Sequence, residues 1–217
     1  MRNHGLSITL SILFLLFMGG QTLTGWHAFN EEQREHGQVA VPLTEYLGTG
    51  HFLEATAENW ESEFLQMAAY IVLTVFLFQR GSAESKKPDE PEEVDRDPRL
   101  SKDNADAPWP VRRGGFVLKL YETSLALAFV LLFAVSFALH AVGGAAAHNE
   151  EAMAHGGETL SAGEFITTSQ FWFESFQNWQ SEFLSLVAMV VLSIFLRQRG
   201  SPESKPVDAA HSETGAG

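Results

Sequence analysis

Four apolar blocks separated by polar segments constrain the fold of this chain more than any other feature. They cover approximately residues 6–26, 60–78, 121–142 and 179–196. A helix needs about 20 mostly apolar residues to cross a hydrocarbon core of roughly 30 Å. Four buried helices of a soluble protein would be the alternative, but residues 130–137 with their flanks are apolar on every helical face. The pattern therefore predicts an all-α membrane protein with four transmembrane helices.

The second and fourth apolar blocks are short for a full crossing. Trp60 and Trp179 stand in their first turns, and tryptophan prefers the level of the lipid headgroups. We therefore expect each of these helices to begin before the hydrocarbon core, near Thr49 and Thr168 respectively.

The basic residues predict the orientation of the chain. Of the 14 Lys and Arg residues, 13 lie before the first block, between the second and third, or after the fourth. Only Arg34 lies in either of the other two loops. Because cytoplasmic loops carry an excess of Lys and Arg, we expect both termini and the middle linker to be cytoplasmic. The chain is then a multi-pass protein of the cell (inner) membrane.

An internal repeat relates the two halves of the chain. Residues 58–86 match residues 177–205 at 18 of 29 positions, with an offset of 119. The same offset, without a gap, relates residues 5–57 to residues 124–176 at 13 of 53 positions. Each copy holds two apolar blocks, so both copies should share one orientation in the membrane. The sequence therefore predicts a tandem 2+2 parallel repeat, and its first block is not a cleaved signal because it aligns with the internal third block.

The repeat also defines four regions of the chain. The first two-helix repeat covers residues 1–80, and the second covers residues 116–199. Between them, residues 81–115 are rich in Pro, Asp, Glu and Lys, a composition that cannot bury enough apolar surface to fold. We expect this segment to be a disordered acidic cytoplasmic linker and residues 200–217 to be a disordered cytoplasmic tail.

Three motifs carry a resemblance to a known group of proteins. The runs NEEQREHG, NWESEFLQM and QRGSAESK resemble an uncharacterised family of bacterial multi-pass membrane proteins, a domain of unknown function. The resemblance covers nearly the whole chain. It implies a bacterial multi-pass membrane protein, and it implies no activity and no site residues.

One polar cluster is the candidate site. Glu63 and Glu182 lie about one turn inside the second and fourth blocks, on polar helical stripes. Gln21 and His140, at aligned positions of the first and third blocks, should lie at a similar depth. Ionisable residues within a membrane often mark proton or ion sites. Alternatively, these carboxylates lie in the hydrated headgroup zone and cap or bridge helices, and their shallow depth favours this second interpretation.

The two outer loops combine acidic residues with histidines. Residues 26–63 contain eight Glu, and residues 143–182 contain six Glu with no Lys or Arg. Imidazole and carboxylate together can bind a divalent metal, but no tight spacing such as HExxH occurs. Solvated acidic loops are therefore favoured, and no metal or cofactor is predicted. The histidines in or beside these loops are His27, His36, His51, His140, His148 and His155.

Composition and motifs exclude several classes of function. The net charge of −13 argues against a nucleic-acid partner, which requires a basic surface. The chain has no cysteine, no P-loop and no G-x-S-x-G motif, so it is not expected to be an enzyme. The leading hypothesis is a structural or accessory membrane component whose partners are the bilayer and either further copies or another membrane protein. The alternative is a small proton- or cation-linked transporter or channel that uses Glu63, Glu182 and His140.

Overall fold

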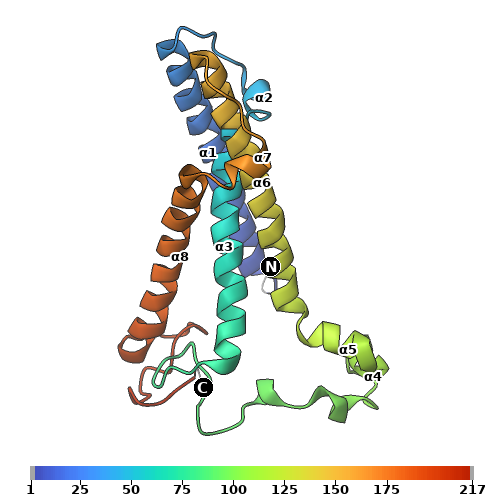
Figure 1. Ribbon diagram of the computed structural model, residues 1–217. Coiled ribbons are helices and arrows are strands. Elements are labelled where there is room, and N and C mark those ends of the chain that lie inside the picture. The colour runs from blue at the N-terminus through green and yellow to red at the C-terminus, as the bar shows by residue number, and fades with distance from the viewer. Residues whose placement is uncertain (1–2, 216–217) are drawn as a thin grey trace. The chain divides into compact units, whose positions relative to one another are not determined.

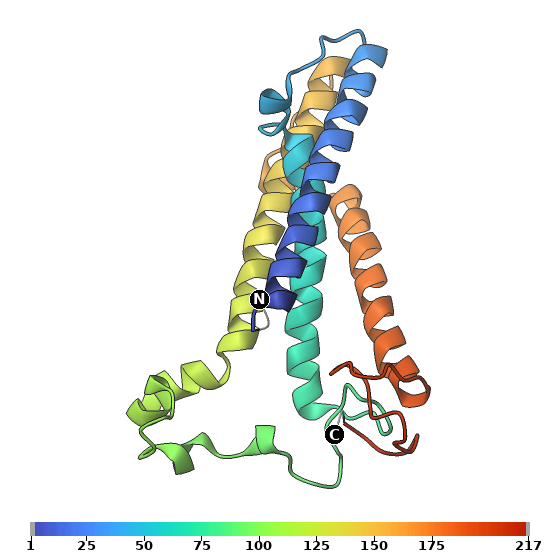
Figure 2. The same ribbon diagram turned by 180° about the vertical axis from the view of Figure 1, so that it is seen from behind.

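The computed structural model describes residues 3–215, and this part of the chain is helical without strands. The long helices can be followed in Figures 1 and 2. They are α1 (Gly5–Glu35), α3 (Gly50–Phe76), α6 (Ser124–His155) and α8 (Ser169–Phe195). The predicted all-α class is confirmed. The short elements are α2 (Leu43–Tyr46), η1 (Glu93–Asp95), η2 (Pro98–Ser101), α4 (Trp109–Arg113), α5 (Gly115–Glu122) and α7 (Ala162–Phe165).

Three of the long helices are long and apolar enough to cross a membrane: α1, α6 and α8. Large apolar side chains cover their surfaces, and Leu6 and Leu131 are 75% and 65% exposed. Such continuous apolar surfaces are unfavourable in water and typical of contact with lipid, so the chain is a membrane protein. Helix α3 is not among the three, because Glu61, Glu63 and Gln66 lower its hydropathy. Its crossing stays a prediction.

Helices α3 and α8 begin where the sequence places their starts. In each case a threonine precedes the first helical residue, and its side chain caps a backbone N–H group of the first turn. The N–H of Phe52 donates to Thr49 Oγ1, and the N–H of Phe171 donates to Thr168 Oγ1, both at 3.2 Å. Such capping satisfies a backbone donor that the helix itself leaves unpaired. The predicted starts near Thr49 and Thr168 are confirmed.

The turn after α1 is braced in the same way as the turn after α6. Asn30 Nδ2 donates to the carbonyl of Val41 at 3.0 Å, and the Val41 N–H donates to Asn30 Oδ1 at 2.7 Å. The same two bonds join Asn149 and Leu160, at 2.8 and 2.7 Å. Each asparagine thus ties the returning loop to its helix, and the two braces are 119 residues apart.

Residues 81–115 and the tail carry only short elements. Within residues 81–115 these are η1, η2, α4 and the first residue of α5, and the ion pair between Lys86 and Asp95 links η1 to the start of the segment. In the tail, Lys205 is buried and its Nζ donates to the carbonyl of Gly81 at 2.6 Å. The disorder of these two segments stays a prediction. Arg2, one of the basic residues used to predict orientation, lies outside the described residues.

Contacts along the chain define two compact units. The first comprises residues 1–59 and 136–173, and the second comprises residues 60–135 and 174–217. Each unit therefore contains segments from both sequence copies. In the first unit a small core forms around Ala141, Ala145, Phe165 and Phe171.

Candidate functional site

In the first unit, helix α6 lies very close to the beginning of α3. A Cβ atom on Gly143 would overlap the backbone of Glu54, and one on Gly144 would overlap the ring of Phe165 and the Glu54 carboxylate. Only glycine permits this approach, which is typical of helices that pack tightly in a membrane protein. The approach sets the carboxylate of Glu54 against the face of α6 that also carries His140.

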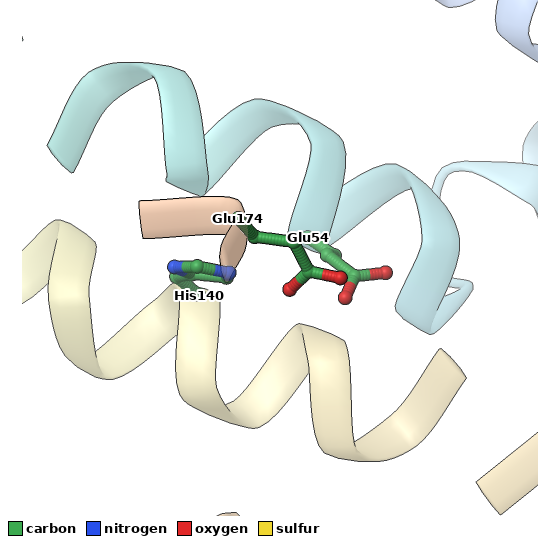
Figure 3. A group of neighbouring side chains, drawn as sticks. All are labelled: Glu54, His140 and Glu174. Carbon is green, nitrogen blue, oxygen red and sulfur yellow. The ribbon is translucent and has the colours of Figure 1, made fainter. Parts of the chain in front are cut away.

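His140 is completely buried at this contact. Its ring stacks on Phe171, with ring centroids 4.6 Å apart and an angle of 27° between the planes. A ligand atom of His140 and one of Glu54 lie within 4.8 Å of each other. Figure 3 shows the two side chains on facing turns of α3 and α6. A carboxylate beside a buried imidazole can fix its tautomer, share its proton or bind an ion with it.

Glu174, also drawn in Figure 3, is the position of the second copy that corresponds to Ala55 of the first copy. Glu174 follows the last residue of the first unit directly, on the same helix α8. In the first copy, Gln21 Nε2 donates to the Ala55 carbonyl and to Thr56 Oγ1, both at 3.4 Å. His140 and Glu174 are the residues 119 positions after Gln21 and Ala55. The second copy therefore has ionisable residues where the first has an amide and a methyl group.

An acidic cavity of about 460 Å³ lies in the first unit, and Glu54 is part of its lining. Four histidines and five glutamates contribute to the lining, with no Lys or Arg among them. Such a cavity attracts cations, because like-signed side chains in a concave surface concentrate the electric field. The ionisable lining residues are Glu32, His36, Glu45, His51, Glu54, His148, Glu150, Glu151 and His155.

The structure distributes the predicted polar cluster over both units. Gln21 and His140 lie in the first unit, where Gln21 bonds to α3 and His140 stacks on Phe171. Glu63 and Glu182 lie in the second unit, where the carbonyl of Glu182 accepts a hydrogen bond from Gln66. A joint site of all four residues stays a prediction.

In the second unit, the polar stripes of α3 and α8 meet as the helical periodicity predicts. Gln66 Nε2 donates to the carbonyl of Glu182 and to Ser185 Oγ, both at 3.1 Å. Gln66 and Ser185 are 119 residues apart, so this bond joins equivalent positions of the two copies.

The comparison with protein families agrees with these features. The family described as "Domain of unknown function (DUF6766)" matches residues 1–216. The chain belongs to this family. No curated protein and no solved structure matches the chain. Membership agrees with the resemblance to an uncharacterised family, and it assigns no activity to any residue.

Sequence reasoning missed two acidic residues of this DUF6766 chain, Glu54 and Glu61. Glu61 is completely buried, and its Oε1 accepts a hydrogen bond of 2.9 Å from Trp179 Nε1. Ala57, Glu61 and Ala68 lie on one face of α3, and small residues on a helix face indicate close packing against another helix. This pattern in the sequence indicates that Glu61 is buried. For Glu54 the signal lies on another helix, in the adjacent glycines of α6.

Proposed function

We propose that the chain is an integral membrane protein of four spanning helices, a tandem 2+2 parallel repeat with cytoplasmic termini in the cell (inner) membrane. It acts as a structural or accessory component, bound to further copies of the chain or to another membrane protein, and not as an enzyme. The bilayer is its other proposed partner. The observation that carries this proposal is the mutual hydrogen bonding of the polar residues on α3 and α8.

These polar residues link helices instead of lining an open path. Gln66 bonds to α8, and Trp179 bonds to Glu61 on α3. In lipid, every polar group must find its partner within the protein, and bonds between helices contribute about 0.6 kcal/mol on average. A set of such bonds stabilises a helix pair, which is what a structural component requires.

The equivalence of α3 and α8 supports a fourth span. Both helices have 27 residues, begin after a capping threonine and occupy the same place in their copy. At 1.5 Å per residue, each is about 40 Å long, which exceeds the thickness of a hydrocarbon core. The pairing of its polar residues with α8 lowers the cost of placing α3 in lipid.

A small proton- or cation-linked transporter or channel is the second candidate function. The proximity of Glu54 to His140, and the placement of Glu63 and Glu182 in one unit, favour it. Further along α3, however, Tyr70 donates to the Glu84 carboxylate at 2.9 Å. That bond uses the hydroxyl that a continuous polar path in the second unit would need.

Reconstitution into liposomes separates the two functions. We expect proteoliposomes loaded with a pH-sensitive dye to show the proton leak of empty liposomes under gradients of H⁺, Na⁺ or K⁺. In parallel, the purified chain should remain a defined complex, either with further copies or with one membrane protein. A flux that disappears in Glu63→Gln and Glu182→Gln, and persists in the exposed control Glu90→Gln, would overturn the structural proposal in favour of transport.

A further inference from the structure

The last turns of α1 and α6 repeat a short motif. Residues 30–37 and 149–156 share Asn, two Glu, His and Gly, so five of the 13 identities between residues 5–57 and 124–176 lie here. The asparagines brace the loops, and Gly37 and Gly156 have φ of +73° and +72°, a conformation that favours glycine. The glutamates and histidines are exposed.

The two histidines of this motif meet in the first unit. The ring centroids of His36 and His155 are 5.5 Å apart, with an angle of 87° between the planes. The two residues are 119 positions apart, so equivalent groups of the two copies come together. Zn²⁺ binds imidazole nitrogen at about 2.0–2.1 Å in tetrahedral geometry, which places the centroids of two bound rings roughly 5 Å apart. The observed separation fits two ligands of one ion.

Each histidine has a carboxylate on the same face of its helix. Glu32 precedes His36 by four residues, and Glu151 precedes His155 by four, so each pair lies one helical turn apart. All four residues line the acidic cavity. Within residues 3–215, the carboxylates of Glu32 and Glu151 make no hydrogen bond and no ion pair, so their exposed side chains can reorient toward a ligand.

We propose that His36, His155, Glu32 and Glu151 form a binding site for one divalent transition-metal ion, with Zn²⁺ as its reference ion. Imidazole and carboxylate are suitable ligands for this class of metal, and the cavity has no Lys or Arg in its lining to oppose a cation. Each sequence copy holds half of the site, which is why the spacing of either copy alone does not resemble a metal motif. The site goes beyond the proposed structural role, and its occupancy would clamp the ends of α1 and α6.

Direct metal binding tests the site. The full chain, purified without a histidine tag in detergent, should bind one Zn²⁺ in equilibrium dialysis. The double variant His36→Ala/His155→Ala should lose affinity by at least about tenfold, because both nitrogen ligands are removed. The matched control His4→Ala/His211→Ala removes two histidines outside the cavity and should bind as the native chain does. Co²⁺ should give the visible absorption of a tetrahedral site in the native chain and the control alone.

A cysteine variant tests the geometry independently of loss of function. Because the chain has no cysteine, His36→Cys/His155→Cys introduces a single thiolate pair. It should bind Zn²⁺ at least as tightly as the native chain, and Co²⁺ should give a thiolate charge-transfer band. Unchanged Zn²⁺ affinity in His36→Ala/His155→Ala would overturn the proposal, as would an equal loss in the control. Binding that disappears in Glu54→Gln but persists in the histidine double variant would overturn it in favour of the Glu54–His140 group.

Discussion

At the scale of single residues, two glycines and two aromatic rings form the contacts of α1 and α6 with the short helices α2 and α7. A Cβ atom on Gly25 would overlap the Tyr46 hydroxyl, and one on Gly144 would overlap the Phe165 ring. Tyr46 and Phe165 are 2% and 0% exposed. The two contacts are equivalent in the repeat, so each copy places an aromatic side chain from its loop on a glycine of its long helix.

The first prediction concerns the glycine of α6, Gly144. Gly144→Ala should destabilise the protein by about 1–3 kcal/mol, because the added methyl group overpacks a contact with the buried Phe165 ring. The matched control is Gly19→Ala, also within a long helix, where the added Cβ has no atom within 4 Å apart from its chain neighbours and its own helix backbone. We expect the control to leave stability unchanged or to raise it, since alanine favours helix. Thermal unfolding in detergent measures both, and equal melting of the two variants would contradict the contact.

A second prediction concerns pH and the capping box of α7. The N–H and the hydroxyl of Ser161 donate to the Glu164 carboxylate at 2.8 and 2.7 Å, and these bonds hold the pKa of Glu164 below its ordinary value. A lowered folded-state pKa stabilises α7 at pH values above the pKa of an unfolded glutamate, and this stabilisation is lost as the pH falls through the lowered value. An NMR titration should show the pKa of Glu164 rising in Ser161→Ala and staying low in Ser161→Thr. Identical titration in all three proteins would contradict the assignment.

At the scale of elements, the same hydrogen bonds recur in both copies of the repeat and hold the helices and their loops. The asparagine braces after α1 and α6 and the threonine caps of α3 and α8 recur at the same offset. The caps fix where α3 and α8 start, and the asparagine braces fix how the loops after α1 and α6 return. The bond between Gln66 and Ser185 then joins the two copies at equivalent positions.

The third prediction tests the brace. Asn149→Ala removes both bonds to Leu160 and leaves a backbone N–H and a carbonyl without these partners, so it should cost about 1–3 kcal/mol. The equivalent Asn30→Ala should behave alike. Asn104→Ala is the control, because its side chain only accepts the exposed N–H of Asp106. Hydrogen exchange of the loop after α6 should accelerate in Asn149→Ala and stay unchanged in the control.

The fourth prediction concerns the contact between α3 and α8. A double-mutant cycle of Gln66→Leu and Ser185→Ala should give a coupling energy of about 0.6 kcal/mol, and up to about 1.7 kcal/mol, as for other hydrogen bonds between membrane helices. A coupling energy of zero would show that the bond of 3.1 Å does not contribute to stability.

The helices were predictable from sequence because hydropathy and capping are local properties. The starts of α3 and α8 follow from one threonine each, and the polar stripes follow from helical periodicity. The contacts between Glu54 and His140, and between His36 and His155, were not predictable. They join helices far apart in the chain, and they depend on where glycines permit a close approach. Glu54 was missed because its signal, Gly143 and Gly144, lies on another helix.

At the scale of the whole molecule, the arrangement in the membrane depends on whether α3 crosses it. Helices α1, α6 and α8 are long and apolar enough to cross a membrane. Helix α3 can be a fourth crossing helix only if its polar face contacts protein and not lipid. A crossing by α3 places the two acidic loops, with the motif of Glu32 and His36 and its second copy, on one side of the membrane. Three crossings would separate the two loops, and the proposed metal site would then lack half of its ligands.

Labelling of single cysteines tests this claim most directly, because the native chain has none. Cysteines introduced at Gln38, Ala105 and Gly157 are treated in intact cells with a thiol reagent that does not cross membranes, with lysed cells as the control for reactivity. Four crossings with cytoplasmic termini predict labelling at Gln38 and Gly157 and protection at Ala105. Labelling at Gln38 and Ala105 with protection at Gly157 would show that α3 does not cross, and would contradict the 2+2 arrangement.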